Sequence, residues 1–258
     1  MTKGCSSPVE AVLLDFGHTL VNYEADEALL VESYRDIHAF LREAGISREP
    51  LPDDLMLTVF RRLTEVITKS YEDGRLEELD CLAIYDDAFR HLGYRLDREL
   101  LHRVLELDHR ALVSQFEVPD ATLAALRQIR ERGYRVGIVS NATPTGAVMR
   151  QDLELLGLAD QVDAAAYSSE VGFRKPHPRI YLSVTEALGV APEACLFVGD
   201  RVKEDILGSQ ALGMRAVLSH EFRQEEPGEA RPTAVIRRFP ELLGVLADLA
   251  AGRGAGAS

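Results

Sequence analysis

The sequence has few cysteines and few lysines, and it contains no long apolar run. The three cysteines, Cys5, Cys81 and Cys195, are widely spaced and form no C-x-x-C pair, which excludes a disulfide framework and a zinc site. The apolar run at residues 11–14 is too short for a signal peptide or a membrane span. We therefore expect a cytoplasmic protein with no membrane segment.

Positive charge is also scarce. The chain has 29 lysines and arginines against 42 acidic residues, a formal net charge of -13, and only four of the basic residues are lysines. Such a surface repels nucleic acid and anionic membranes, so neither is an expected partner. An anionic substrate needs a local reversal of the field by a metal ion, a buried lysine or a helix N-terminus.

The 258 residues, 46% of them hydrophobic, fit one domain with an insertion or two small domains. Short apolar runs that precede helical patterns predict strands at 11–15, 135–140, 195–200 and 215–218, with a weaker strand at 164–167. Continuous apolar runs are typical of parallel strands buried on both faces. The cap and stop residues predict helices starting at Asp120, at Thr143-Pro144 and at Pro178. The sequence predicts an α/β core with helices on both faces of its sheet.

Residues 23–114 show helical spacing and no strand-like run. Four apolar stripes predict four helices: Leu30, Tyr34, Ile37 and Leu41; Leu55, Val59, Leu63 and Val66; Leu79, Leu82, Ala83 and Phe89; Leu101, Val104, Leu105 and Leu112. We expect an all-helical domain at 23–114, inserted into a core of residues 1–22 and 115–258. It enters after the first strand and rejoins before the second, so it should cover the carboxyl edge of the sheet, where open α/β sheets bind ligands. Such an insertion is placed to act as a lid.

Polar residues follow four of the predicted strands. Asp15 ends the first strand, Ser140-Asn141 end the second, Lys175 follows the weaker one, and Asp200 and Asp205 follow the fourth. Together they offer a carboxylate nucleophile, a hydroxyl and an amide, one cation, and carboxylates for a hard cation such as Mg²⁺. This set of groups is what phosphoryl transfer needs.

These segments, with Gly172-Phe173-Arg174-Lys175-Pro176-His177-Pro178 followed by Gly199-Asp200 and Asp205, resemble the haloacid dehalogenase (HAD) superfamily of hydrolases, in its branch with a helical cap inserted after the first motif. The resemblance covers nearly the whole chain. It implies a Rossmann-like parallel sheet with an inserted helical cap. It also implies a Mg²⁺-dependent hydrolase that acts on a small phosphorylated metabolite through an aspartyl-phosphate intermediate.

The resemblance also implies roles for single residues. Asp15 would be the nucleophile, Ser140 would bind the phosphoryl oxygens with Asn141 beside it, and Lys175 would neutralise their charge. Mg²⁺ would be bound by Asp15, the backbone carbonyl of Gly17 and Asp200. Asp205 would complete the metal site by orienting waters, or would orient Lys175.

The sequence departs from the family at Gly17, where most of its phosphatases carry a second aspartate that protonates the leaving oxygen. Loss of such a group typically costs about 10² to 10⁴ in rate unless the leaving group is a stable anion. His18 follows at once, and its imidazole titrates in the useful range, so it is a candidate replacement. Gly17 and His18 are therefore expected at the substrate.

Three alternatives stay open. Haloacid dehalogenases also lack the second aspartate, but their fourth motif holds no metal, which the pair Asp200 and Asp205 opposes. Phosphonate-cleaving relatives use a cap lysine, and Lys69 is the only lysine in the predicted cap. A HAD-like module that has lost turnover and binds a ligand or a protein is the non-enzymatic alternative, which Gly17 favours.

In the cap, Arg75 is a candidate for binding a second anionic group of the substrate. The sequence is also compatible with a homodimer formed through the cap.

Overall fold

The computed structural model describes the backbone of residues 8–23, 27–46 and 55–252, without the side chains of residues 27–32 and 55–56. Cys5, the side chains of Leu30 and Leu55, and the tail from residue 253 lie outside the described residues. Cys81 and Cys195 are free and buried.

In the described part of the chain, six parallel strands form one sheet in the order β3-β2-β1-β4-β5-β6. The strands are β1 (Ala11–Leu14), β2 (Arg135–Ser140), β3 (Ala164–Tyr167), β4 (Cys195–Gly199), β5 (Arg215–Ser219) and β6 (Ala234–Ile236). β1 and β4 are completely buried, as parallel strands covered on both faces should be. The predicted α/β fold is confirmed. β6 was not predicted, because it is a three-residue edge strand whose Val235 is exposed.

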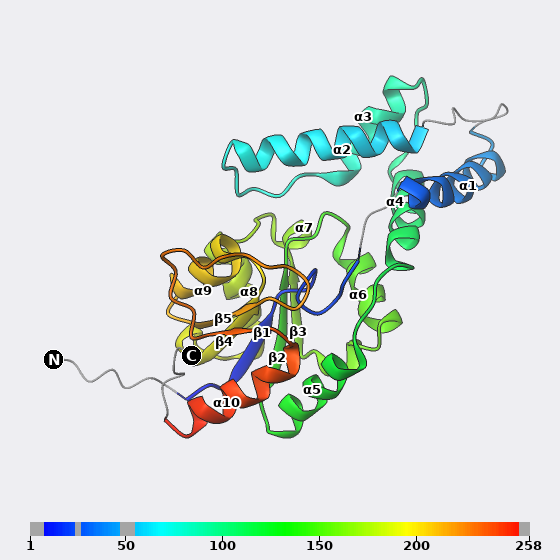
Figure 1. Ribbon diagram of the computed structural model, residues 1–258. Helices are drawn as coiled ribbons and strands as arrows, with labels where there is room; N and C mark the ends of the chain where they lie inside the picture. The colour runs from blue at the N-terminus through cyan, green and yellow to red at the C-terminus, as the bar shows by residue number, and fades with distance from the viewer. Residues whose placement is uncertain (1–7, 24–26, 47–54, 253–258) are drawn as a thin grey trace.

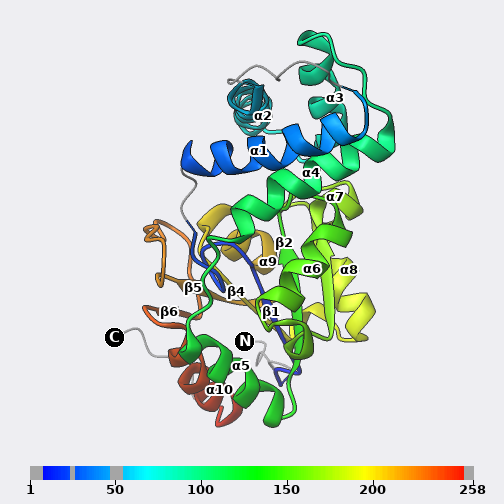
Figure 2. The ribbon, with the colours of Figure 1, turned by 90° about the vertical axis from the view of Figure 1, so that its right-hand side faces the viewer.

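Helices cover both faces of this sheet (Figure 2). On one face, Val12 and Leu14 pack against α5 (Asp120–Glu131), α6 (Gly146–Leu155) and α10 (Leu242–Ala250). On the other, Ala11 and Leu13 pack against α8 (Pro178–Leu188). Successive side chains of β1 point to opposite faces of the sheet, because the side-chain period of a strand is two residues. The shorter elements are η1 (Ala159–Gln161), α7 (Ser168–Val171), η2 (Pro192–Ala194), η3 (Val202–Leu207), α9 (Gly208–Gln210) and η4 (Phe239–Glu241).

The predicted helix ends hold to within a few residues. α8 begins at Pro178 and ends at Leu188, and the next residue, Gly189, has a φ of 65°, which favours glycine. Asp120 is the first residue of α5 rather than its cap, which is Pro119, and α6 begins at Gly146, two residues after the predicted Thr143-Pro144 start.

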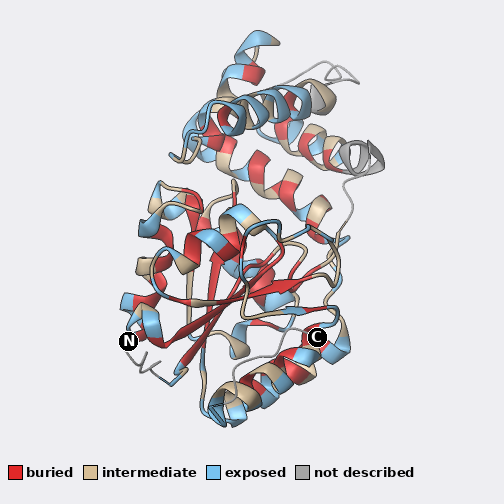
Figure 3. Cartoon of the chain, turned by 60° about the vertical axis from the view of Figure 1, so that its left-hand side comes forward, coloured by how far each residue is buried: buried red, intermediate tan, exposed pale blue. Residues whose placement is uncertain are grey.

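In the insertion after β1, the regular elements of the described residues are all helices. The insertion contains α1 (Glu27–Glu43), α2 (Leu55–Glu72), α3 (Cys81–His91) and α4 (Arg98–Val113), and Figure 1 shows these helices above the carboxyl edge of the sheet. They have a hydrophobic core of their own, in which Ile37, Leu41, Phe89 and Val104 are completely buried. Figure 3 shows buried residues along the strands and on the inward sides of the helices. Most residues of the predicted stripes therefore lie on inward faces, but Ala83 of the third stripe is exposed.

The segment that leaves the sheet after β1 and the segment that returns to it before α5 lie side by side. Asn22 and Glu117 exchange two backbone hydrogen bonds, with N···O distances of 2.9 and 3.0 Å. The two connections between insertion and core are thus tied to each other. Of the helices that the structure describes, none combines the length and the apolar character needed to cross a bilayer.

Candidate active site

The strand ends bring the predicted residues to one edge of the sheet. Asp15 directly follows β1, and its backbone N–H donates to the carbonyl of Val198 in β4 at 2.9 Å. Leu14 pairs with Ile138 and with Val198, so Ser140 and Asp200 each lie one residue beyond the level of Asp15 on the flanking strands. The topology therefore gathers residues that are far apart in the sequence.

Lys175 lies between two carboxylates. Its Nζ is 2.6 Å from Asp15 Oδ1 and 2.7 Å from Asp205 Oδ1. The Lys175 side chain is 3% exposed and that of Asp205 is 0% exposed. A buried ammonium is stable only when it is paired in this way. This ammonium is the local positive charge that an anionic substrate requires.

Asn141 holds the loop that carries Lys175. Its Oδ1 accepts the backbone N–H of Lys175 at 2.7 Å, and its Nδ2 donates to the carbonyl of the same residue at 3.4 Å. Lys175 precedes a cis proline, Pro176. The amide predicted to lie beside the substrate is therefore occupied with the backbone of the lysine loop.

Asp200 is bound from two sides. Arg223 donates to its Oδ2 at 2.7 Å, and the hydroxyl of Thr19 lies 3.4 Å from its Oδ1 and 3.1 Å from Asp15 Oδ2. Neither Thr19 nor Arg223 was singled out from the sequence. Thr19 lies in the segment Phe16–Leu20 after the first strand, a signal that could have found it, whereas Arg223 lies in a loop with no recognisable pattern.

The charged groups of the site shift one another's pKa values. Burial, together with the charges of Asp15 and Asp205, raises the pKa of Asp200 to about 7. Burial also raises the pKa of Asp205 to about 6, although the ammonium of Lys175 opposes this shift. Burial lowers the pKa of Lys175, but the carboxylates of Asp15 and Asp205 outweigh it, and the pKa of the lysine is raised overall. Three carboxylates in one crevice repel one another and favour an added cation.

The donor set fits a hard divalent cation. Oxygen atoms of Asp15, Asp200 and Asp205 lie within 4.8 Å of one another, all three residues are buried, and such ligands suit Mg²⁺. Both oxygens of Asp205 are engaged, one by Lys175 and the other by the backbone N–H of Arg201 at 2.9 Å. The oxygens of Asp15 and Asp200 also accept hydrogen bonds, from Lys175, Thr19 and Arg223, so the three carboxylates form one buried group that could hold a metal.

Gly17 and His18 form the turn after β1. His18 has a φ of 58°, and its ring stacks on Tyr23 with centroids 4.7 Å apart. Burial and the charge of Arg223 lower the pKa of His18, although the charge of Asp15 opposes them. The imidazole of His18 thus lies against a tyrosine that the sequence gave no reason to single out.

The cap touches the lysine loop through Arg174. Its guanidinium donates to Ser70 Oγ at 2.6 Å and to the carbonyl of Arg75 at 2.8 Å, and it lies 4.3 Å from the ring centroid of Tyr71. Arg174 is 2% exposed. The residue before Lys175 therefore links the end of α2 to the active-site edge.

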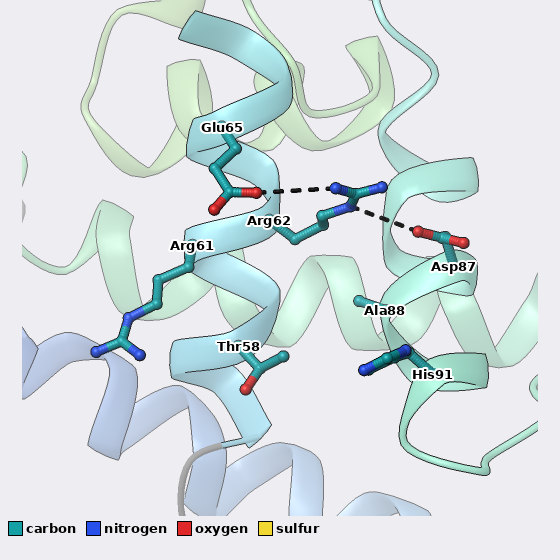
Figure 4. A pocket seen from close by; sticks show the side chains of 7 residues that line it. All are labelled: Thr58, Arg61, Arg62, Glu65, Asp87, Ala88 and His91. Atoms are coloured by element: carbon teal, nitrogen blue, oxygen red, sulfur yellow. Dashed lines mark ion pairs between the residues drawn. The ribbon is translucent and has the colours of Figure 1, made fainter. Parts of the chain in front are cut away.

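The side chains of the two cap candidates point elsewhere. The side chain of Arg75 is 67% exposed and that of Lys69 is 74% exposed, and both pair with Asp73. A lysine this exposed is not the desolvated amine that a Schiff base requires. A separate hollow between α2 and α3 is lined by Thr58, Arg61, Arg62, Glu65, Asp87, Ala88 and His91 (Figure 4). It contains none of the predicted site residues.

Comparisons with known proteins identify the family of this chain. The family model of haloacid dehalogenase-like hydrolases matches residues 9–213. A glyceraldehyde 3-phosphate phosphatase of Methanopyrus kandleri is 29% identical over 248 residues, which are 94% of this chain and 99% of that protein. A phosphoserine phosphatase of Thermus thermophilus is 37% identical over 110 residues, 42% of this chain and 43% of that protein.

Solved structures have the same fold. A HAD phosphatase from Thermococcus onnurineus superposes with a TM-score of 0.61 at 26% identity, over 92% of this chain and 98% of that one. A 2-haloacid dehalogenase from Pseudomonas syringae pv. Tomato superposes with a TM-score of 0.65 at 21% identity, over 93% and 98% of the two chains. Since the family model covers most of the residues, this chain belongs to the haloacid dehalogenase-like hydrolases.

Proposed function

We propose that the protein is a divalent-metal-dependent phosphatase that acts on a small phosphorylated metabolite. The observation that carries this proposal is the contact of Lys175 Nζ with Asp15 at 2.6 Å, within a group of three buried carboxylates. The names of the relatives support it, because the glyceraldehyde 3-phosphate and phosphoserine phosphatases both remove phosphate from small metabolites.

In the proposed reaction, a carboxylate oxygen of Asp15 attacks phosphorus, the bond to the leaving oxygen breaks, and an aspartyl-phosphate forms. Water then attacks phosphorus, and the carboxylate of Asp15 is released. Lys175 neutralises the charge that develops on the phosphoryl oxygens, and Ser140 donates a hydrogen bond to them. Asp205 keeps the ammonium in place. A Mg²⁺ ion bound by Asp15, Asp200 and the carbonyl of Gly17 would supply further positive charge.

We further propose that residues 23–114 act as a cap over a core of residues 1–22 and 115–258. The cap would contact the part of the substrate that is not phosphate and would exclude water during transfer. Arg174 would keep the cap in register with the lysine loop. The cytoplasmic location and a homodimer through the cap remain predictions of the sequence.

The test is a screen of phosphorylated metabolites with Mg²⁺, in which phosphate release is measured with and without a chelator. Aryl and acyl phosphates should react faster than alkyl phosphates, because good leaving groups need no proton from the carboxylate missing at Gly17. Haloacids and phosphonoacetaldehyde serve as controls for the dehalogenase and phosphonatase alternatives. Turnover of a control alone would reassign the chemistry, and no turnover at all would favour a binding module.

A further inference from the structure

Tyr23 fills the space beside Gly17. A Cβ atom built on Gly17 would lie 3.3 Å from the hydroxyl oxygen of Tyr23 and 3.4 Å from its Cε1. The phenol therefore occupies the direction in which a side chain at position 17 would project. That is where a second aspartate begins in relatives that have one.

The ring of Tyr23 packs between His18, in the turn after β1, and Phe116, where the chain returns from the insertion to the core. The ring of Tyr23 stacks on that of His18, with centroids 4.7 Å apart and an interplanar angle of 21°. The centroid of the Phe116 ring is also 4.7 Å from that of Tyr23. Phe116 precedes Glu117, which pairs with Asn22 next to the tyrosine. The orientation of the ring is thus set by packing on two sides, as a site group requires.

The hydroxyl also lies within the field of the carboxylate cluster. Burial raises the pKa of Tyr23, and the charges of Asp15 and Asp200 raise it further, although Arg223 opposes them. The raised pKa keeps the phenol an O–H donor within the electrostatic field of Asp15 and Asp200.

We propose that Tyr23 supplies the hydrogen-bond donor that Gly17 lacks, by donating to the ester oxygen that leaves when the phosphoryl group passes to Asp15. This proposal rests on the proposed phosphatase function. The phosphorus–oxygen bond breaks with its electron pair on the leaving oxygen, and the hydroxyl of Tyr23 stabilises the charge there. The leaving oxygen then takes a proton from water, so Tyr23 stays neutral throughout. His18 is a positioning residue that supports the ring.

The first test measures kcat/KM for phosphate esters of graded leaving-group pKa in wild type and in Tyr23→Phe. The variant should lose about 10- to 100-fold on alkyl phosphates, the size of a hydrogen bond to a charged group. It should stay within about two-fold on p-nitrophenyl phosphate, whose leaving group is already a stable anion. The dependence on leaving-group pKa therefore becomes steeper, which a purely structural role of the hydroxyl would not cause.

The matched control is Tyr134→Phe. Tyr134 also packs, partly buried, against the same hydrophobic cluster, but it precedes β2 and so lies at the opposite edge of the sheet. This variant should leave the whole series unchanged. Parallel slopes for wild type and Tyr23→Phe would overturn the inference and leave the proposed function intact. A wild type that releases phosphate from no ester would overturn both.

A second test examines the shared space directly. Gly17→Asp should gain nothing on alkyl phosphates and should lower the melting temperature, because its side chain meets the phenol. Combining it with Tyr23→Ala should raise alkyl phosphate turnover above that of Tyr23→Ala alone. If the changes in melting temperature caused by Gly17→Asp and Tyr23→Ala simply add in the double variant, the two side chains do not compete for the same space. That result would overturn the inference.

Discussion

The sheet edge and the helical insertion bury different kinds of side chain. At the edge, Asp15 and Asp205 are buried with Lys175 and share its single positive charge across distances of 2.6 and 2.7 Å. In the insertion, the buried cluster is made of apolar side chains such as Phe89 and Val104. The difference teaches that buried charged side chains gather at the sheet edge, while the core of the insertion is formed mainly by apolar helix packing. The two regions meet through polar contacts of Arg174, which lies next to the lysine, and through the buried pair of His109 in α4 and Asp152 in α6, whose Nε2 and Oδ2 atoms are 2.7 Å apart.

The largest effect is expected at Asp15. Asp15→Asn should lower turnover by about 10⁴-fold or more, because the amide is a poor nucleophile, while the fold is kept. Phosphate release and the melting temperature measure the two properties. Asp160→Asn, the same change at an exposed position, is the control and should leave both unchanged. Full activity in Asp15→Asn would exclude the covalent mechanism.

Removing the ammonium should affect both activity and stability. Lys175→Met should reduce kcat by about 10²- to 10³-fold. It should also lower the free energy of unfolding by about 3–5 kcal/mol, because Asp15 and Asp205 lose the charge that pairs them. Chemical denaturation of this variant and of the exposed control Lys203→Met gives the comparison. Equal stability of the two variants would show that the buried cluster does not depend on the lysine.

The link between the two regions should matter less. Arg174→Ala should raise KM by about ten-fold with a smaller change in kcat, because charged hydrogen bonds of about 1.5–3 kcal/mol that hold the cap are lost. Hydrogen exchange should become faster at the end of α2. The control is Arg75→Ala, whose exposed side chain is not part of the link. If exchange in α2 is the same in both variants, Arg174 does not hold the cap.

The smallest effect is a pH dependence of metal binding. The pKa of Asp200 is raised to about 7 and that of Asp205 to about 6, above the usual value near 3.8. The stability linked to these groups is therefore fully present below about pH 4 and falls as pH rises through 6 and 7. Because the proposed site binds Mg²⁺ through the ionised form of Asp200, Mg²⁺ should raise the melting temperature by a few degrees more at pH 8 than at pH 5.

Thermal unfolding with and without Mg²⁺ at the two pH values measures this difference. Asp200→Asn should remove the Mg²⁺-dependent shift, and Asp160→Asn should keep it. A shift that is larger at pH 5 would contradict the assignment of Asp200 to the metal.

Sequence reasoning predicted the parallel sheet and the all-helical insertion, because apolar runs and helical stripes are local signals. It also placed Asp15, Lys175, Asp200 and Asp205 at one edge, since parallel strands share their carboxyl end. It did not predict β6, which lacks a buried run. It also missed Arg223 and Arg174, because their partners lie far away in the sequence.

The sequence by itself determined the fold, through local apolar runs and helical stripes, and the family and the charged groups, through the order and spacing of the strand-end residues. Only the tertiary structure decided how those groups are used. It placed the amide of Asn141 on the lysine loop, both oxygens of Asp205 on donors other than a metal, and the phenol of Tyr23 in the space above Gly17. The physical reason is that hydrogen bonds and packed volumes join atoms across the fold, and a linear pattern carries no information about which atoms meet.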